Sequence, residues 1–189
     1  MDNTPSRSFR RLTPCYRGAF GGRDLVVDTA PSRGVRDTIP IVADETLDES
    51  SWIGLISQSL HLTEALRFCA DARAGAIDLF LGCTRAQQRG DGVPLVALDY
   101  EAFPELAERQ LRELVKQARS QFPIIRCVVL HRLGRVPLAE PSVVIVVATP
   151  HRAESFAACR WLIDMLKREV AIWKREVWSD GVGSWVDPG

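Results

Sequence analysis

Residues 142–173, SVVIVVATPHRAESFAACRWLIDMLKREVAIW, contain an apolar run followed by a long helical pattern. The first eight, 142–149, are rich in β-branched residues and almost wholly apolar, which is typical of a central strand covered on both faces. From His151 to about Trp173 the apolar residues recur at helical spacing. They are Phe156, Cys159, Ile163, Leu166 and Val170. The stretch predicts a buried strand that leads through Pro150 into a long helix.

Strand signals continue upstream of this stretch. Residues 124–130 and 76–83 form two more β-branched or apolar runs, and a short apolar segment at 53–56 can form a third. Residues 93–103 alternate apolar and acidic side chains, as a strand with one wet face does. Because a loop with Gly90 and Gly92 separates residues 76–83 from residues 93–103, we expect these two strands to pair as a hairpin.

Two further helices are expected between the strands. Thr63 can cap a helix that carries Leu62, Leu66 and Cys69 on one side and ends near Gly75. A second helix is expected from Pro104 to the residue before Pro123, with apolar residues at spacings of three and four. They are Ala107, Leu111, Leu114, Ala118 and Phe122. Mixed hairpin-like and crossover connections favour a single domain of the α+β class over 51–189, with a mixed or antiparallel sheet.

The composition disfavours several classes of protein. Lys+Arg and Asp+Glu both number 24 among 189 residues, so no overall charge attracts nucleic acid or an anionic membrane. Five scattered cysteines and three histidines offer no CxxC pair and no zinc-type spacing, so we expect no metal, no cofactor and no disulfide scaffold. No run approaches the roughly 20 apolar residues of a membrane span. We therefore expect a cytosolic protein in a reducing compartment.

Residues 1–50 differ in kind from the rest. Arginines stand among Ser, Pro and Gly and are followed by an acidic run, without apolar periodicity. Such a segment buries too little apolar surface to offset its ordering entropy, so a disordered tail is expected. The alternative is an organelle transit peptide, because residues 3–23 are Arg-rich and contain no acidic residue, although their amphipathic spacing is poor.

Two groups of basic residues lie on the long predicted helix. His151 and Arg152 stand at its N-terminus, where unpaired N–H groups favour an anion or a phosphate, although ordinary capping explains them equally well. Lys167 and Lys174 share a second stripe if the helix stays regular. Clustered cations lower each other's pKa, and this makes a neutral amine available for catalysis. By spacing alone, a solvated basic face is the simpler interpretation of this stripe.

The segment Gly82-Cys83-Thr84-Arg85 ends a predicted strand. Its glycine allows close approach to a ligand, and Arg85 can bind an anion through two N–H groups. A plain strand exit with a solvated arginine would look the same. Cys83 fits a small buried filler better than a nucleophile.

Five segments, taken together, resemble the large, catalytic subunit of molybdopterin synthase. They are 74–76 leading to 82–85, Leu98–Ala102, His131–Gly134, His151–Ala153, and 164–167 followed by 172–176. Trp185 also resembles the family's tryptophan near the C-terminus. The segments occur in family order over roughly the last two thirds of the chain, and five in register are far more specific than any one.

The resemblance implies an α/β-hammerhead-like fold and a sulfurtransferase of molybdenum cofactor biosynthesis. Two such subunits form a dimer, and each holds a small ubiquitin-like carrier, which makes a heterotetramer. The carrier's C-terminal Gly-Gly thiocarboxylate supplies sulfur, and two sulfurs convert cyclic pyranopterin monophosphate (precursor Z) into the dithiolene of molybdopterin. The alternative is a non-catalytic scaffold that binds the carrier, but a scaffold has no need for both lysines.

The resemblance also assigns roles to individual residues. Lys167 and Lys174 match the catalytic lysines, and His151 and Arg152 match a substrate-binding pair. Lys174 with its neighbours Arg175 and Glu176 matches a further substrate contact, and Arg85 completes the anion pocket.

Two positions depart from the family pattern. Ala171 stands where the family usually has proline, so the helix can either run on to Lys174 or end in an irregular turn without proline. Ala86-Gln87-Gln88 replaces an asparagine that often follows the arginine, which concerns contacts of that loop.

Overall fold

The structure is a computed structural model that describes residues 49–186. The predicted tail, 1–50, lies outside the described residues except for its last two positions. The elements, in chain order, are β1 (Ser51–Ile56), α1 (Leu62–Cys69), β2 (Ala76–Cys83), β3 (Leu95–Ala102), α2 (Pro104–Gln121), β4 (Arg126–Arg132), β5 (Gly134–Pro137), β6 (Pro141–Thr149), α3 (Arg152–Glu169), β7 (Ile172–Trp178) and β8 (Gly183–Val186). The α+β class is confirmed. None of the helices in this range has the length and apolarity to cross a membrane.

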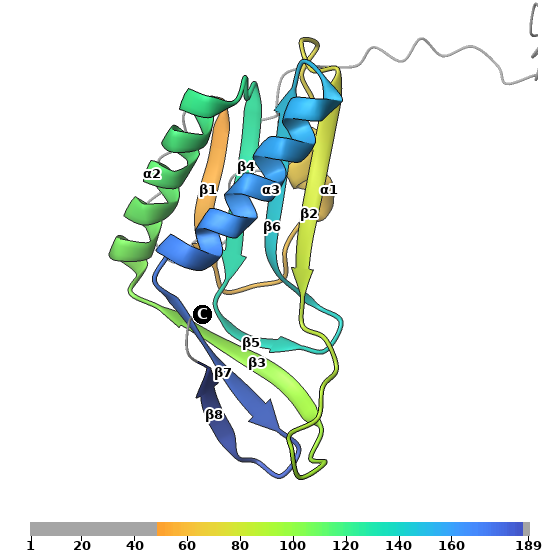
Figure 1. Ribbon diagram of the computed structural model, residues 1–189, viewed down its shortest axis with the longest axis vertical. Coiled ribbons are helices and arrows are strands. Elements are labelled where there is room, and N and C mark those ends of the chain that lie inside the picture. The colour runs from red at the N-terminus through yellow and green to blue at the C-terminus, as the bar shows by residue number, and fades with distance from the viewer. Residues whose placement is uncertain (1–48, 187–189) are drawn as a thin grey trace, which may run out of the picture.

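The first sheet has the strand order β1-β4-β6-β2 and is mixed, since β1 runs parallel to β4 and the other pairs are antiparallel. Helices α2 and α3 cover one face and α1 covers the other (Figure 1). The predicted central strand is β6, in which residues 142–149 are all buried. Successive side chains of a strand point to opposite faces, so β6 supplies both cores. Val143, Ile145 and Val147 pack towards α2 and α3, and Val144, Val146 and Ala148 pack towards α1.

The second sheet has the order β5-β3-β7-β8, is antiparallel throughout, and lies at the end of the first sheet where α3 ends (Figure 1). The expected hairpin between 76–83 and 93–103 is wrong. β2 pairs with β6, whereas β3 pairs with β5 and β7. Phe80, Leu79 and Leu81 of β2 are half-buried against the two cores that β6 supplies, and Ile77 is exposed. The connection 84–94 is long enough to carry the chain from one sheet to the other.

The helix predicted to reach Trp173 ends at Glu169. Val170 is already extended, with φ −92° and ψ 126°, and Ile172 and Trp173 belong to β7. Lys167 and Lys174 therefore lie in different elements and do not share a helix face. Of the two outcomes considered for Ala171, the irregular turn without proline is the one observed. Residues 172–178 form a strand and not a continuation of the helix, because their backbone pairs with β3 and β8, which a helix cannot do.

Smaller differences concern the first helix and two side chains. α1 begins at Leu62 after His61, so Thr63 is not its N-cap, and it ends at Cys69, well before Gly75. Leu66 and Phe156, expected on buried stripes, are exposed. In contrast, α2 begins with Pro104 and ends at Gln121, as predicted, and its apolar residues are buried or half-buried.

Candidate functional site

The two lysines lie on either side of the turn that joins α3 to β7. Lys167 stands in the last turn of α3, and Lys174 is the third residue of β7. Both side chains are exposed. Within residues 49–186, neither lysine takes part in a hydrogen bond or an ion pair with another side chain. Both cations are therefore available to an anionic ligand.

The backbone of the turn between the lysines is held by hydrogen bonds. The N–H of Val170 donates to the carbonyl oxygen of Leu166 at 3.1 Å, and the N–H of Ile172 donates to that of Val170 at 2.8 Å. The N–H of Ala171 donates to Oε1 of Gln110, in α2, at 2.9 Å. The packing of α2 against this turn thus limits how far the two lysines can move apart.

The residues after Lys174 alternate between the two faces of β7. Lys174 is directly opposite Tyr100 of β3, so their side chains share one face. Arg175 points to the other face, where its Nη2 donates to Oδ2 of Asp99 at 2.8 Å and its guanidinium lies 5.9 Å from the ring centre of Trp185. The substrate contact of Arg175 stays a prediction, and the charge of this residue is already balanced by Asp99.

Both carboxylate oxygens of Glu176 accept hydrogen bonds from neighbouring side chains. Nε2 of Gln87 donates to Oε1 at 2.5 Å, and the hydroxyl of Ser184 donates to Oε2 at 3.3 Å. Gln87 belongs to the loop that carries Arg85, so Glu176 fastens that loop to β7. The departure from the family pattern at 86–88 thus coincides with a contact that positions Arg85. The substrate contact of Glu176 likewise stays a prediction.

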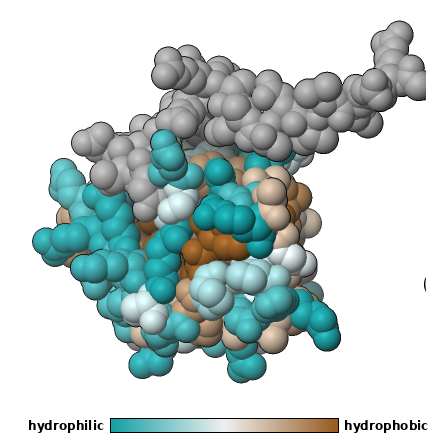
Figure 2. All heavy atoms as spheres, turned by 90° about the horizontal axis from the view of Figure 1, so that it is seen from above, coloured by the Kyte–Doolittle hydropathy of each residue, from teal (hydrophilic) through white to brown (hydrophobic). Residues whose placement is uncertain are grey.

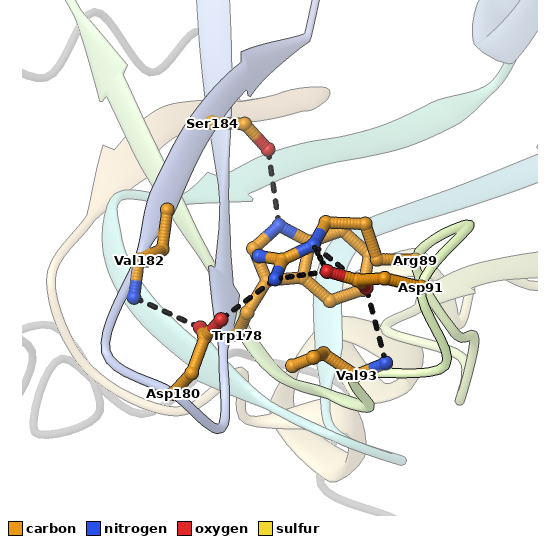
Figure 3. A network of polar contacts seen from close by, with 7 residues as sticks. All are labelled: Arg89, Asp91, Val93, Trp178, Asp180, Val182 and Ser184. Atoms are coloured by element: carbon orange, nitrogen blue, oxygen red, sulfur yellow. Dashed lines mark hydrogen bonds and ion pairs between the residues drawn. The ribbon is translucent and has the colours of Figure 1, made fainter.

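Arg89 holds the same loop at a second point (Figure 3). Its Nη2 donates to a carboxylate oxygen of Asp91 and of Asp180, both at 2.7 Å, and its guanidinium lies over the ring of Trp178 at 5.6 Å. The hydrogen bonds from Arg89 lower the pKa of Asp91 and of Asp180. Because Asp180 lies in the β7–β8 turn, this network joins the loop to the second sheet.

Arg85 is exposed at the start of this loop, two residues after β2, whose C-terminal end lies on the side of the second sheet (Figure 1). Cys83 is exposed rather than buried, so its expected role as a buried filler is wrong. The strand has a register shift between Gly82 and Cys83, and the next residue, Thr84, takes the buried position. The hydroxyl of Thr84 has no hydrogen-bond partner among the described residues.

His151 and Arg152 lie at the opposite end of α3 from Lys167. His151 immediately precedes the helix, and Arg152 is its first residue; both side chains are exposed. At 1.5 Å per residue, Arg152 and Lys167 are about 22 Å apart along the helix axis. Figure 2 views the end of the molecule where α3 begins and shows hydrophilic side chains around a central apolar area. One chain alone does not bring the predicted phosphate-binding pair to the lysines.

A buried histidine packs against Tyr100, the residue opposite Lys174. The imidazole of His131 is almost completely buried in β4, and burial lowers its pKa to about 4. Its Nδ1 is 2.9 Å from the carbonyl oxygen of Arg132, and its ring meets the ring of Tyr100 edge-on at 5.0 Å. Burial also raises the pKa of Tyr100. His131 is thus a neutral packing residue that supports the strand opposite Lys174.

Sequence reasoning missed Gln110. A glutamine on an amphipathic helix carries no signal of its own, and only the missing proline at Ala171 pointed to a need for another partner at this turn. Gln110 also lines an open groove of about 440 Å³ along α2, together with Arg109, Arg112, Glu113 and Lys116. No cluster of three or more His, Cys, Asp or Glu side chains that could hold a metal ion occurs within residues 49–186.

Comparison with known proteins identifies the family. The family model described as MoaE protein matches residues 55–169. The molybdopterin synthase catalytic subunit of Nostoc sp. is 37% identical over 158 residues, which cover 83% of this chain and 94% of the relative. The crystal structure of molybdopterin synthase from Staphylococcus aureus superposes with a TM-score of 0.66 at 26% identity, covering 75% of this chain and 98% of that one.

A more distant structure shows the same fold within a complex. It is the protein–protein complex of subunits 1 and 2 of molybdopterin-converting factor from Helicobacter pylori, with a TM-score of 0.58 at 18% identity over 71% of this chain and 90% of that one. The family model spans most of the first sheet and its helices and includes Lys167. The chain therefore belongs to the MoaE family, the family of molybdopterin synthase catalytic subunits.

Proposed function

We propose that this chain transfers sulfur from the C-terminal thiocarboxylate of a small ubiquitin-like carrier to cyclic pyranopterin monophosphate. Two transfers form the dithiolene of molybdopterin and open the cyclic phosphate. Each carrier ends as its carboxylate, because water takes the place of the sulfur at the acyl carbon. Membership of the MoaE family is the observation that carries this proposal.

The charges at the α3–β7 turn support it. A thiocarboxylate and a phosphate are both anions, and Lys167 and Lys174 are exposed cations without a counterion among the described residues. Arg85 is exposed in the loop that the Gln87–Glu176 contact joins to the strand of Lys174, and it adds a third positive charge. Lys167 meets the incoming thiocarboxylate and either stabilises the anion that develops or transfers a proton.

We propose a dimer of these chains, each with one carrier, as the working assembly. The distance along α3 supports it, since a site that contains both Lys167 and the pair His151–Arg152 cannot be built within one chain. A second copy can bring its His151 and Arg152 to the lysines of the first. The helix N-terminus that they flank favours a phosphate, which matches the charge of the pterin precursor.

The test is a reconstituted reaction. The purified full-length chain is mixed with thiocarboxylated carrier and cyclic pyranopterin monophosphate, and the dithiolene product is oxidised to a fluorescent pterin and measured. Lys167→Ala is expected to keep its fold and carrier affinity but to lose at least about a hundredfold in turnover, because an interaction made in the transition state has gone. Lys116→Ala, which removes an exposed lysine from α2, is the matched control and should turn over like the parent.

Each outcome separates the alternatives. Full activity of Lys167→Ala would remove this lysine from the mechanism. A parent chain that binds the carrier and yields no product would support the scaffold instead.

A further inference from the structure

The turn after α3 closes through a hydrogen bond around Ala171, where the family usually has proline. The hydrogen bond from the N–H of Ile172 to the carbonyl of Val170 spans only three residues, which defines a γ-turn centred on Ala171. Among the described residues other than glycine, only Ala139 has a positive φ, so Ala171 adopts the inverse form. That form has φ near about −75° at its centre, close to the value that proline fixes.

The chain contains a second copy of this turn in which proline does occupy the centre. After α2, the N–H of Ile124 donates to the carbonyl of Phe122 at 2.8 Å, around Pro123. Phe122 is extended, with φ −127° and ψ 146°, and its N–H donates to the carbonyl of Ala118, one turn back. Val170 is extended in the same way, with its N–H bonded to Leu166. Both long helices thus end in the same turn.

The two turns differ in what fixes them. Proline supplies its φ covalently and has no N–H. Ala171 has both a free φ and an N–H, and that N–H is taken by Oε1 of Gln110 at 2.9 Å in a half-buried contact. We propose that Gln110 is a positioning residue, which holds the Ala171 turn by this hydrogen bond and thereby sets the position of Lys174 relative to Lys167.

The consequence for catalysis rests on the proposed function. Lys167 lies in the last turn before this γ-turn, and Lys174 lies in the strand that follows it. The γ-turn is therefore the short stretch of backbone that links the two lysines. Displacement of a reacting group by about 1 Å can lower a rate by as much as a hundredfold. Gln110 touches neither lysine by any hydrogen bond in the described chain, so its effect on the reaction passes through the backbone of Ala171.

The experiment is a double-mutant cycle on the full chain with its carrier. Gln110→Ala should lower kcat roughly tenfold and leave carrier affinity unchanged, because the lysines remain but are less well placed. Ala171→Pro should be accommodated, since Val170 already has a backbone suited to a following proline. In the Ala171→Pro background, Gln110→Ala should change kcat by less than about twofold, because no N–H is left to bind. Gln117→Ala, seven residues further along α2, is the matched control.

Amide exchange of Ile172 is measured on the same variants. Gln110→Ala should speed this exchange several-fold, and Gln117→Ala should not. A merely structural role for Gln110 would lower stability without changing kcat in folded protein. An unchanged kcat in Gln110→Ala, or a loss that proline at 171 does not restore, overturns the proposal. An inactive parent would instead refute the proposed function and the catalytic half of this inference with it, and amide exchange would still decide whether Gln110 fixes the turn.

Discussion

The basic side chains at the α3–β7 end differ in whether an acidic side chain pairs with them. Arg175 is balanced by Asp99 and Arg89 by two aspartates, so these guanidinium groups hold the structure together. Lys167 and Lys174 are exposed without such partners in the described chain. Surface ion pairs are screened by solvent and contribute little to stability, so these paired arginines mainly fix the orientation of the segments that they join. At the scale of the residue, Lys167 and Lys174 are therefore the cations that are available to bind an anionic substrate.

His131 makes the stability of the fold depend on pH. Its pKa is lowered from 6.5 to about 4 by burial, so the folded protein keeps the imidazole neutral while the unfolded chain takes up a proton below pH 6.5. Stability therefore falls as the pH decreases from about 6.5 to about 4, and this histidine contributes no further loss below that window. Between pH 7 and pH 5 the cost is about 2 kcal/mol.

Urea unfolding of the parent and of His131→Gln at pH 7 and pH 5 measures this contribution. The variant starts from a lower stability, because it loses the packing against Tyr100, but it should lose about 2 kcal/mol less than the parent between the two pH values. An equal loss in both proteins would mean that His131 is not held neutral.

At the scale of elements, local periodicity was enough to predict most helices and strands but not where α3 ends or which strands pair. The apolar pattern that placed Val170 on the buried stripe was right about burial, since Val170 is in the core, and wrong about conformation. The segment IWKREVW fits a helix or a strand by itself, and its state is set by pairing with β3, more than 60 residues earlier. The hairpin prediction failed for the same reason, since the pairing of β2 with β6 depends on residues far away in the sequence.

The junction between β2 and the start of α3 depends on a glycine. The N–H of Gly75 donates to the carbonyl of Thr149 at 3.1 Å, and a Cβ at Gly75 would lie 2.2 Å from the carbonyl oxygen of Pro150. This oxygen belongs to the backbone and cannot move away alone. Gly75→Ala is therefore expected to lower the free energy of unfolding by about 3 kcal/mol.

Gly90→Ala is the control, because nothing lies within 4 Å of a Cβ at that position. Its effect should stay within about 0.5 kcal/mol or be slightly stabilising. Chemical denaturation measures the free energy of unfolding of both variants. Equal values would show that the backbone at 149–150 can shift at little cost to make room for the added methyl group.

At the scale of the whole molecule, the predicted site residues fall into two groups at the two ends of α3. The family resemblance supplied their identities, and the helix predicted from His151 already separates Arg152 from Lys167 by most of its length. The loop with Arg85 and the strand with Lys174 meet because Gln87 and Arg89 reach across from one sheet to the other. The remaining pair can complete this site only from a second chain, which the proposed dimer supplies.

Subunit complementation tests that arrangement. Lys167→Ala and Arg152→Ala are each expected to be nearly inactive as homodimers. When the two chains are co-expressed and mix at random, half of the dimers pair one variant with the other, and in each of these one of the two sites combines an intact Lys167 with an intact Arg152. The mixture should therefore recover about a quarter of the parental turnover. Co-expression of Lys167→Ala with the double variant Lys167→Ala/Arg152→Ala should recover none, because no chain then supplies Lys167. Absence of recovery in the first mixture, with dimers present by light scattering, would mean that His151 and Arg152 act at a place of their own and not beside the partner's lysines.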